Sequence, residues 1–199
     1  MSTTAPKGLS IAKLSVHPRL SEETLCYTCD VLWNGRTIGA ASNRGHGGMT
    51  LVQFTGPDAD REAALASVEG RTWPAGTMTD AAGNPMPMSF EDVVDQMAYD
   101  KADRIRIAAS IKRRLAKNTV YAVGDKVWRR CQPYTPAVGA EIRAKEPDAV
   151  IYNEMALDAA VEVELAIAKR AAAAEASTLA ERLRRHHAQH SGTREPHDN

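Results

Sequence analysis

A period-two pattern of residues between Thr24 and Asn34 constrains the fold of this chain more than any other stretch. One parity of the alternation holds Leu25, Tyr27, Cys29, Val31 and Trp33. Period two is the pattern of a strand with one buried face. The pair Asn34-Gly35 follows, and it tolerates the positive φ angles of a type I′ turn. We therefore predict a hairpin with a two-residue turn, whose register pairs Trp33 with Arg36, Val31 with Ile38 and Cys29 with Ala40.

Three glycines surround one histidine just after this hairpin, in Asn43-Arg44-Gly45-His46-Gly47-Gly48. We call residues 43–48 the glycine corner. Glycine allows backbone conformations that are closed to other residues, and it allows close approach of another group. The stretch is either a contact loop that presents Arg44 and His46 to a partner, or a tight turn with a solvated His46. No catalytic motif is completed here, which favours the turn.

Several short strings in this part of the chain resemble a group of small proteins encoded by bacteriophages and other mobile elements. They are SEET at residues 21–24, the NG of the turn and the N-x-G-x-GG pattern of the glycine corner, and the similarity extends to Asn153-Glu154. The group has no assigned activity, so no site residue is carried over from it. The resemblance implies a context, namely an accessory protein of a mobile element, a class that includes inhibitors of host defence systems.

The composition is that of an ordinary globular chain, with 199 residues, 43% hydrophobic and 25% charged. No apolar run could span a bilayer and the N-terminus has no hydrophobic signal core, so we expect a cytoplasmic protein without a membrane partner. Cys26 and Cys29 have the spacing of a zinc pair, but within a strand an odd offset places the two thiols on opposite faces. We expect no metal and no cofactor, and we interpret His186, His187 and His190 as solvated.

Charge is unevenly distributed, although the net charge is zero. Residues 1–100 carry 7 basic and 12 acidic side chains, whereas residues 101–130 carry 10 basic and 2 acidic ones. Such a basic face can contact phosphates or an acidic protein surface, although most basic runs are solvated outer faces. The candidate partner-binding residues are Arg44, His46, Lys101, Arg106, Arg113, Arg114, Lys117, Arg129 and Arg130.

The remaining signals complete an α+β fold, in which an antiparallel sheet from two hairpins packs on a long central helix. Residues 89–117 form the predicted central helix, with Ser89 as its N-cap and Ile105 and Ile111 on its apolar side. A second hairpin is predicted about Gly124-Asp125. The predicted domain organisation is a flexible start (1–7), the α+β domain (8–153), an extended Ala-rich helix (154–190) and a disordered tail (191–199). The extended helix could bind a partner or a second copy of the chain.

The sequence contains no phosphate-binding loop, dinucleotide fingerprint, nucleophile elbow or HExxH motif. The leading hypothesis is a non-enzymatic accessory protein that inhibits a host protein or ribonucleoprotein complex, such as a defence complex, by steric occlusion. An alternative is direct nucleic-acid binding through residues 101–130. A further alternative is a small hydrolase that uses His46 with Asp30 or Cys26.

Overall fold

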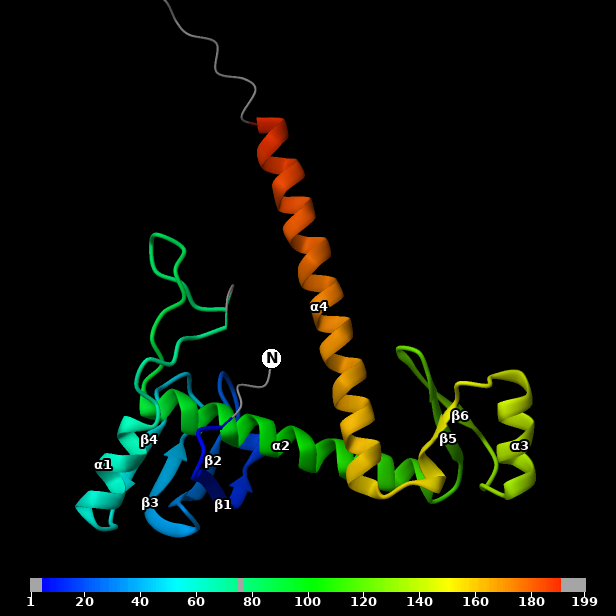
Figure 1. Cartoon of the computed structure of the whole chain (residues 1–199), viewed down its shortest axis with the longest axis horizontal. Helices are drawn as coiled ribbons and strands as arrows, with labels where there is room; N and C mark the ends of the chain where they lie inside the picture. Colours follow the sequence, from blue (N-terminus) through cyan, green and yellow to red (C-terminus); the bar gives the residue numbers. More distant parts are fainter. Residues whose placement is uncertain (1–4, 75–76, 191–199) are drawn as a thin grey trace, which may run out of the picture. The chain divides into compact units, whose positions relative to one another are not determined.

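The computed structural model describes residues 5–74 and 77–190, with only the backbone described at 179–180 and 183–190. The α+β class is confirmed, with antiparallel sheets and helices following one another along the chain (Figure 1). The predicted tail, the first four residues of the predicted flexible start and the side chains of the three C-terminal histidines lie outside the described residues. Contacts divide the chain into two compact units, Met1–Arg106 (unit 1) and Ile107–Asn199 (unit 2).

Unit 1 contains a four-stranded antiparallel sheet in the order β1-β2-β3-β4. Its strands are β1 (Leu9–Val16), β2 (Tyr27–Trp33), β3 (Arg36–Asn43) and β4 (Leu51–Phe54). Because of this order, β1 and β4 are the two edges of the sheet. The predicted turn between β2 and β3 forms, with φ of 48° at Asn34 and 80° at Gly35.

A β-bulge in β3 corrects the predicted register of the first hairpin. The observed pairs are Trp33 with Arg36, Val31 with Gly39 and Cys29 with Ala41. The prediction holds at the turn and is wrong beyond it, because the bulge places the extra residue Ile38 in β3. Ile38 remains buried, but Ala40, which we predicted on the buried face, is exposed.

The helices of unit 1 are α1 (Asp58–Ala66) and the first part of α2 (Phe90–Leu115). Ser89 and Asp92 form a reciprocal capping box at the start of α2, because each side chain accepts a hydrogen bond from the backbone amide of the other (2.8 and 3.1 Å). Buried side chains of the sheet and of both helices form one core, which includes Tyr27, Val31, Ile38, Ala64, Phe90, Val93, Val94 and Ala98. The predicted burial of Ile105 is wrong: the residue is 54% exposed, and it lies beyond Ala98, the last residue of α2 in this core.

Unit 2 has its own three-stranded antiparallel sheet in the order β6-β5-β7. The strands are β5 (Thr119–Val123), β6 (Lys126–Arg130) and β7 (Val150–Ile151), and the second predicted hairpin is confirmed with Tyr121 opposite Trp128. We predicted one sheet from both hairpins, but the hairpins belong to separate sheets. A turn signal determines the partner of a strand within its hairpin, and it carries no information about which hairpins join.

The helices that complete unit 2 are α3 (Pro136–Lys145) and α4 (Leu157–His190). We predicted that the last helix begins at Glu154, but residues Tyr152–Glu154 form a 3-10 turn before it. The Asn153 side chain accepts a hydrogen bond from the Val120 amide (2.9 Å) and donates one to the carbonyl of Asn118 (3.2 Å). Glu154 accepts hydrogen bonds from the Tyr134 hydroxyl and the Arg143 guanidinium, which hold its pKa below the usual range. Asn153 and Glu154 therefore stabilise unit 2 through hydrogen bonds between segments that are distant in sequence.

Candidate functional site: the glycine corner

The glycine corner follows β3 and is fixed by residues 22–24. The carbonyl oxygen of Gly45 accepts three hydrogen bonds, from the backbone amides of Glu22 (3.0 Å), Glu23 (2.9 Å) and Thr24 (3.3 Å). Gly45 has a φ of 87°, and a Cβ atom there would lie 2.0 Å from the carbonyl oxygen of Leu20. Only glycine combines this conformation with this close approach of two backbone segments.

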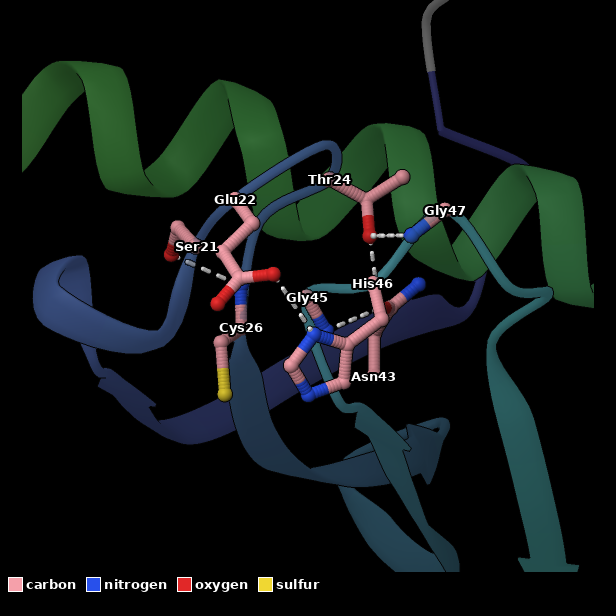
Figure 2. A network of polar contacts seen from close by, with 8 residues as sticks. All are labelled: Ser21, Glu22, Thr24, Cys26, Asn43, Gly45, His46 and Gly47. Atoms are coloured by element: carbon pink, nitrogen blue, oxygen red, sulfur yellow. Dashed lines mark hydrogen bonds and ion pairs between the residues drawn. The ribbon is translucent and has the colours of Figure 1, made fainter.

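Asn43 connects the strand end to the corner through its side-chain amide, as Figure 2 shows in part. Its Oδ1 accepts hydrogen bonds from the Thr24 hydroxyl and the Gly45 amide, both at 2.9 Å. Its Nδ2 donates to the carbonyl of Gly48 (3.1 Å) and to the hydroxyl of Thr50 (3.2 Å). All four hydrogen-bonding positions of the amide are filled, and the residue is only 5% exposed. The corner is therefore a rigid, internally bonded structure.

The same network continues into the core of unit 1. Thr50 donates a hydrogen bond to the Asp95 carboxylate (2.6 Å), and the buried Tyr27 hydroxyl lies 3.2 Å from the same oxygen. Burial raises the pKa of Asp95, and the hydrogen bonds from Thr50 and Tyr27 oppose this only in part. The carboxylate form of Asp95 is thus a cost to the folded state at neutral pH.

We expect Asp95→Asn to stabilise unit 1 at neutral pH and to reduce the pH dependence of its stability. A raised folded-state pKa gives a contribution that is present at acidic pH and is lost as the pH rises through that pKa. Asparagine keeps an acceptor for Thr50 and Tyr27 but carries no charge. Urea unfolding at several pH values from acidic to neutral measures the effect, with the exposed Glu69→Gln as control. A stability difference between Asp95→Asn and the wild type that does not change with pH would contradict this prediction.

The exposed surface of the corner combines basic and apolar side chains. Arg44 and His46 are both exposed, and His46 Nδ1 lies 3.2 Å from Glu22 Oε2 (Figure 2). Beside them Met49 is 79% exposed and Leu51 is 56% exposed. These four side chains line an open hollow of about 340 Å³, together with Ser42, Asn43 and Gly48. We call Arg44, His46, Met49 and Leu51 the corner surface.

The structure gives His46 and Asp30 different partners from those of the hydrolase hypothesis. His46 is paired with Glu22, whereas Asp30 is paired with Lys13 (Nζ–Oδ2 2.9 Å). Cys26 is buried and its backbone amide donates to the Ser21 hydroxyl (2.9 Å). At the corner, the side chains of Thr24 and Asn43 form hydrogen bonds that hold the backbone in place.

The candidate cations of residues 101–130 fall into two groups. Some are bonded inside their own unit: Lys101 donates to the carbonyl of Ile11 (2.9 Å), Arg106 pairs with Asp103, Arg114 with Glu164 and Arg130 with Glu141. Arg113, Lys117 and Arg129 are exposed and form no ion pair with any residue in the described part of the chain. Among the candidate cations of this stretch, these three are the most available to a partner.

Sequence reasoning missed the apolar half of the corner surface. The signal was present in the short strand Leu51–Phe54, since Val52 and Phe54 pack against the core of unit 1 and alternation turns Leu51 outward. Met49 precedes this strand and directly follows Gly48, where no periodic pattern indicates its exposure.

Comparisons with protein families, with curated proteins and with solved structures find no match to this chain. Among the side chains that the structure describes, which exclude those of His186, His187 and His190, no three His, Cys, Asp or Glu are grouped so that they could hold a metal ion. Within residues 5–74 and 77–190, no helix has the length and apolar character needed to cross a membrane.

Proposed function

We propose that this chain is a non-enzymatic binding protein that docks on a host protein or ribonucleoprotein complex and blocks part of its surface. The observation that carries the proposal is the exposure of Met49 and Leu51 beside Arg44 on a rigid corner. Large apolar side chains exposed together and rimmed by polar ones mark contact sites. Methionine and arginine are also enriched at the centres of protein interfaces.

The rigidity of the corner supports the same proposal. Association is opposed by the loss of freedom of loops and side chains that become ordered in the complex. The corner backbone is already fixed by the hydrogen bonds of Gly45 and of Asn43, so little backbone order remains to be gained on binding. A preformed corner of this kind is suited to occlusion of a partner surface, and the resemblance to mobile-element proteins suggests a host complex as the partner.

We expect Met49→Asp to weaken partner binding by at least about 30-fold, which corresponds to the ~2 kcal/mol that defines an interface hot spot. The new charge would have to be buried against the partner without a counter-charge. The matched control is Met78→Asp, which makes the same replacement at a methionine that is 46% exposed elsewhere in unit 1. Affinity capture from host lysate, with and without nuclease, identifies the partner, and biolayer interferometry then compares both variants. Equal affinities for Met49→Asp and the wild type would refute the proposal.

A second candidate function is nucleic-acid binding through residues 101–130. The observation that favours it is the exposure of Arg113, Lys117 and Arg129 without ion pairs in the described part of the chain. Cations that are not neutralised by carboxylates are available to phosphates, and binding through them weakens as salt increases.

A further inference from the structure

Strand β6 carries an exposed tryptophan in a row of cations. Lys126, Trp128 and Arg130 are alternate residues of β6, so their side chains share one face of the sheet. Trp128 is 49% exposed and lies directly opposite Tyr121 of β5. Because β6 is an edge of its sheet, no further strand of the described chain flanks Trp128. An exposed indole offers a large flat apolar surface to a ligand.

The chain segment that contains β6 is strongly basic. Residues 107–132 contain seven basic side chains and one acidic side chain, Asp125, which is itself paired with Arg170. Two of the seven are neutralised, Arg114 by Glu164 and Arg130 by Glu141. The other five are exposed: Lys112, Arg113, Lys117, Lys126 and Arg129. Of these five, Lys126 shares the Trp128 face of β6. Glu141 of α3 and Glu146, which follows α3, lie near Tyr121 and Arg130. The excess of basic over acidic side chains in this segment is complementary to a polyanion.

The combination of an exposed ring with exposed cations is suited to single-stranded nucleic acid. An acidic protein surface could also bury the indole, since tryptophan is enriched at protein-interface hot spots, so an acidic peptide is one arm of the test. Single-stranded nucleic acid uses both the ring and the cations, because its bases are free to stack on an aromatic ring while its phosphates contact cations. Bases in a duplex are already stacked on one another and cannot reach the ring without unpairing.

We infer that β6 forms a binding site for single-stranded nucleic acid, with Trp128 stacking on a base and Lys126 contacting a neighbouring phosphate. This inference rests on the second candidate function, nucleic-acid binding. Arg130, at the other end of the row, is neutralised by Glu141, so Lys126 provides the charge on the Trp128 face. Arg129 adds charge from the opposite face of the same edge strand.

The test is fluorescence anisotropy of the full chain with a labelled oligouridine of about 12 nucleotides, and with a duplex of the same length. We expect the single strand to bind more tightly than the duplex. Trp128→Leu should lower the affinity for the single strand by about tenfold, whereas Trp128→Phe should bind much as the wild type does because it keeps an aromatic ring. Lys126→Glu should weaken binding and flatten its dependence on salt, by about 0.7 in the log–log slope for each phosphate that the variant no longer neutralises. The matched control is Arg19→Glu, which reverses the charge of an exposed arginine in unit 1.

Two results would overturn the inference, and only one of them would also refute nucleic-acid binding. If Trp128→Leu binds as the wild type does, and duplex and single strand bind equally, the ring has no role and only nucleic-acid binding through charge remains. If neither nucleic acid binds while a polyglutamate peptide does, nucleic-acid binding itself is refuted and the basic region contacts an acidic protein. An unchanged thermal transition of Trp128→Leu verifies that the folded chain is being compared.

Discussion

Replacing Gly45 by alanine is expected to destabilise unit 1 by about 4 kcal/mol, near the upper end of the range for single substitutions. The added Cβ would lie 2.0 Å from the carbonyl oxygen of Leu20 and 2.9 Å from Cys26 Cβ. A φ of 87° adds the intrinsic cost of a left-handed conformation, about 1–2 kcal/mol for a residue with a side chain. Relief of the clash would require residues 20–24 to move away from the corner and to lose their hydrogen bonds to the Gly45 carbonyl.

The glycine corner contains its own matched control for this prediction. Gly48 has no positive φ, and a Cβ there would meet no atom within 4 Å, so Gly48→Ala should change stability by less than about 0.5 kcal/mol. Urea unfolding followed by tryptophan fluorescence compares the two variants with the wild type. Similar stabilities for Gly45→Ala and Gly48→Ala would show that residues 20–24 do not pack on the corner as described.

Local signals in the sequence were sufficient for the hairpins, the capped central helix and the existence of a tight corner. Asn34-Gly35 and Gly124-Asp125 specify turns through their own conformational preferences, and Ser89 with Asp92 specifies a helix start three residues apart. The bulge at Ile38 was not predictable, because it depends on how β3 fits against both of its neighbours in the sheet. The assignment of the two hairpins to separate sheets likewise depends on long-range packing.

The candidate site shows the same division between local and long-range information. The glycine pattern predicted either a contact loop or a tight turn, but nothing in residues 43–48 indicates that residues 22–24 donate three amides to it. Charge patterning found the cations and could not distinguish their roles. Lys101 and Arg114 are bonded to Ile11 and Glu164, which lie far away in the sequence, whereas Arg113 and Lys117 are exposed. Which cation is available to a partner is therefore a property of the folded unit.

The second large loss of stability is expected on substitution of Asn43. It would come from lost hydrogen bonds, whereas that of Gly45→Ala comes from a steric clash. Asn43→Ala should cost about 3 kcal/mol at every pH, because it leaves the buried amide of Gly45 without its acceptor and removes the hydrogen bond from Asn43 to the Thr50 hydroxyl. Asn43→Asp has the same shape and keeps the acceptor for Gly45. It loses the donor to the Gly48 carbonyl. It also places a second carboxylate near that of Asp95, because the Thr50 hydroxyl forms hydrogen bonds with the side chains at positions 43 and 95.

The two Asn43 variants should therefore separate in their dependence on pH. Burial and the nearby Asp95 raise the folded-state pKa of the carboxyl introduced by Asn43→Asp, so its protonated form is favoured in the folded state. The stability of Asn43→Asp is then highest at acidic pH and falls as the pH rises through that pKa, more steeply than in the wild type. Urea unfolding across this pH range measures the slope, with the exposed Gln53→Glu on β4 as the matched amide-to-acid control. Parallel pH profiles for Asn43→Asp and Asn43→Ala would mean that the side chain at position 43 does not share a buried network with Asp95.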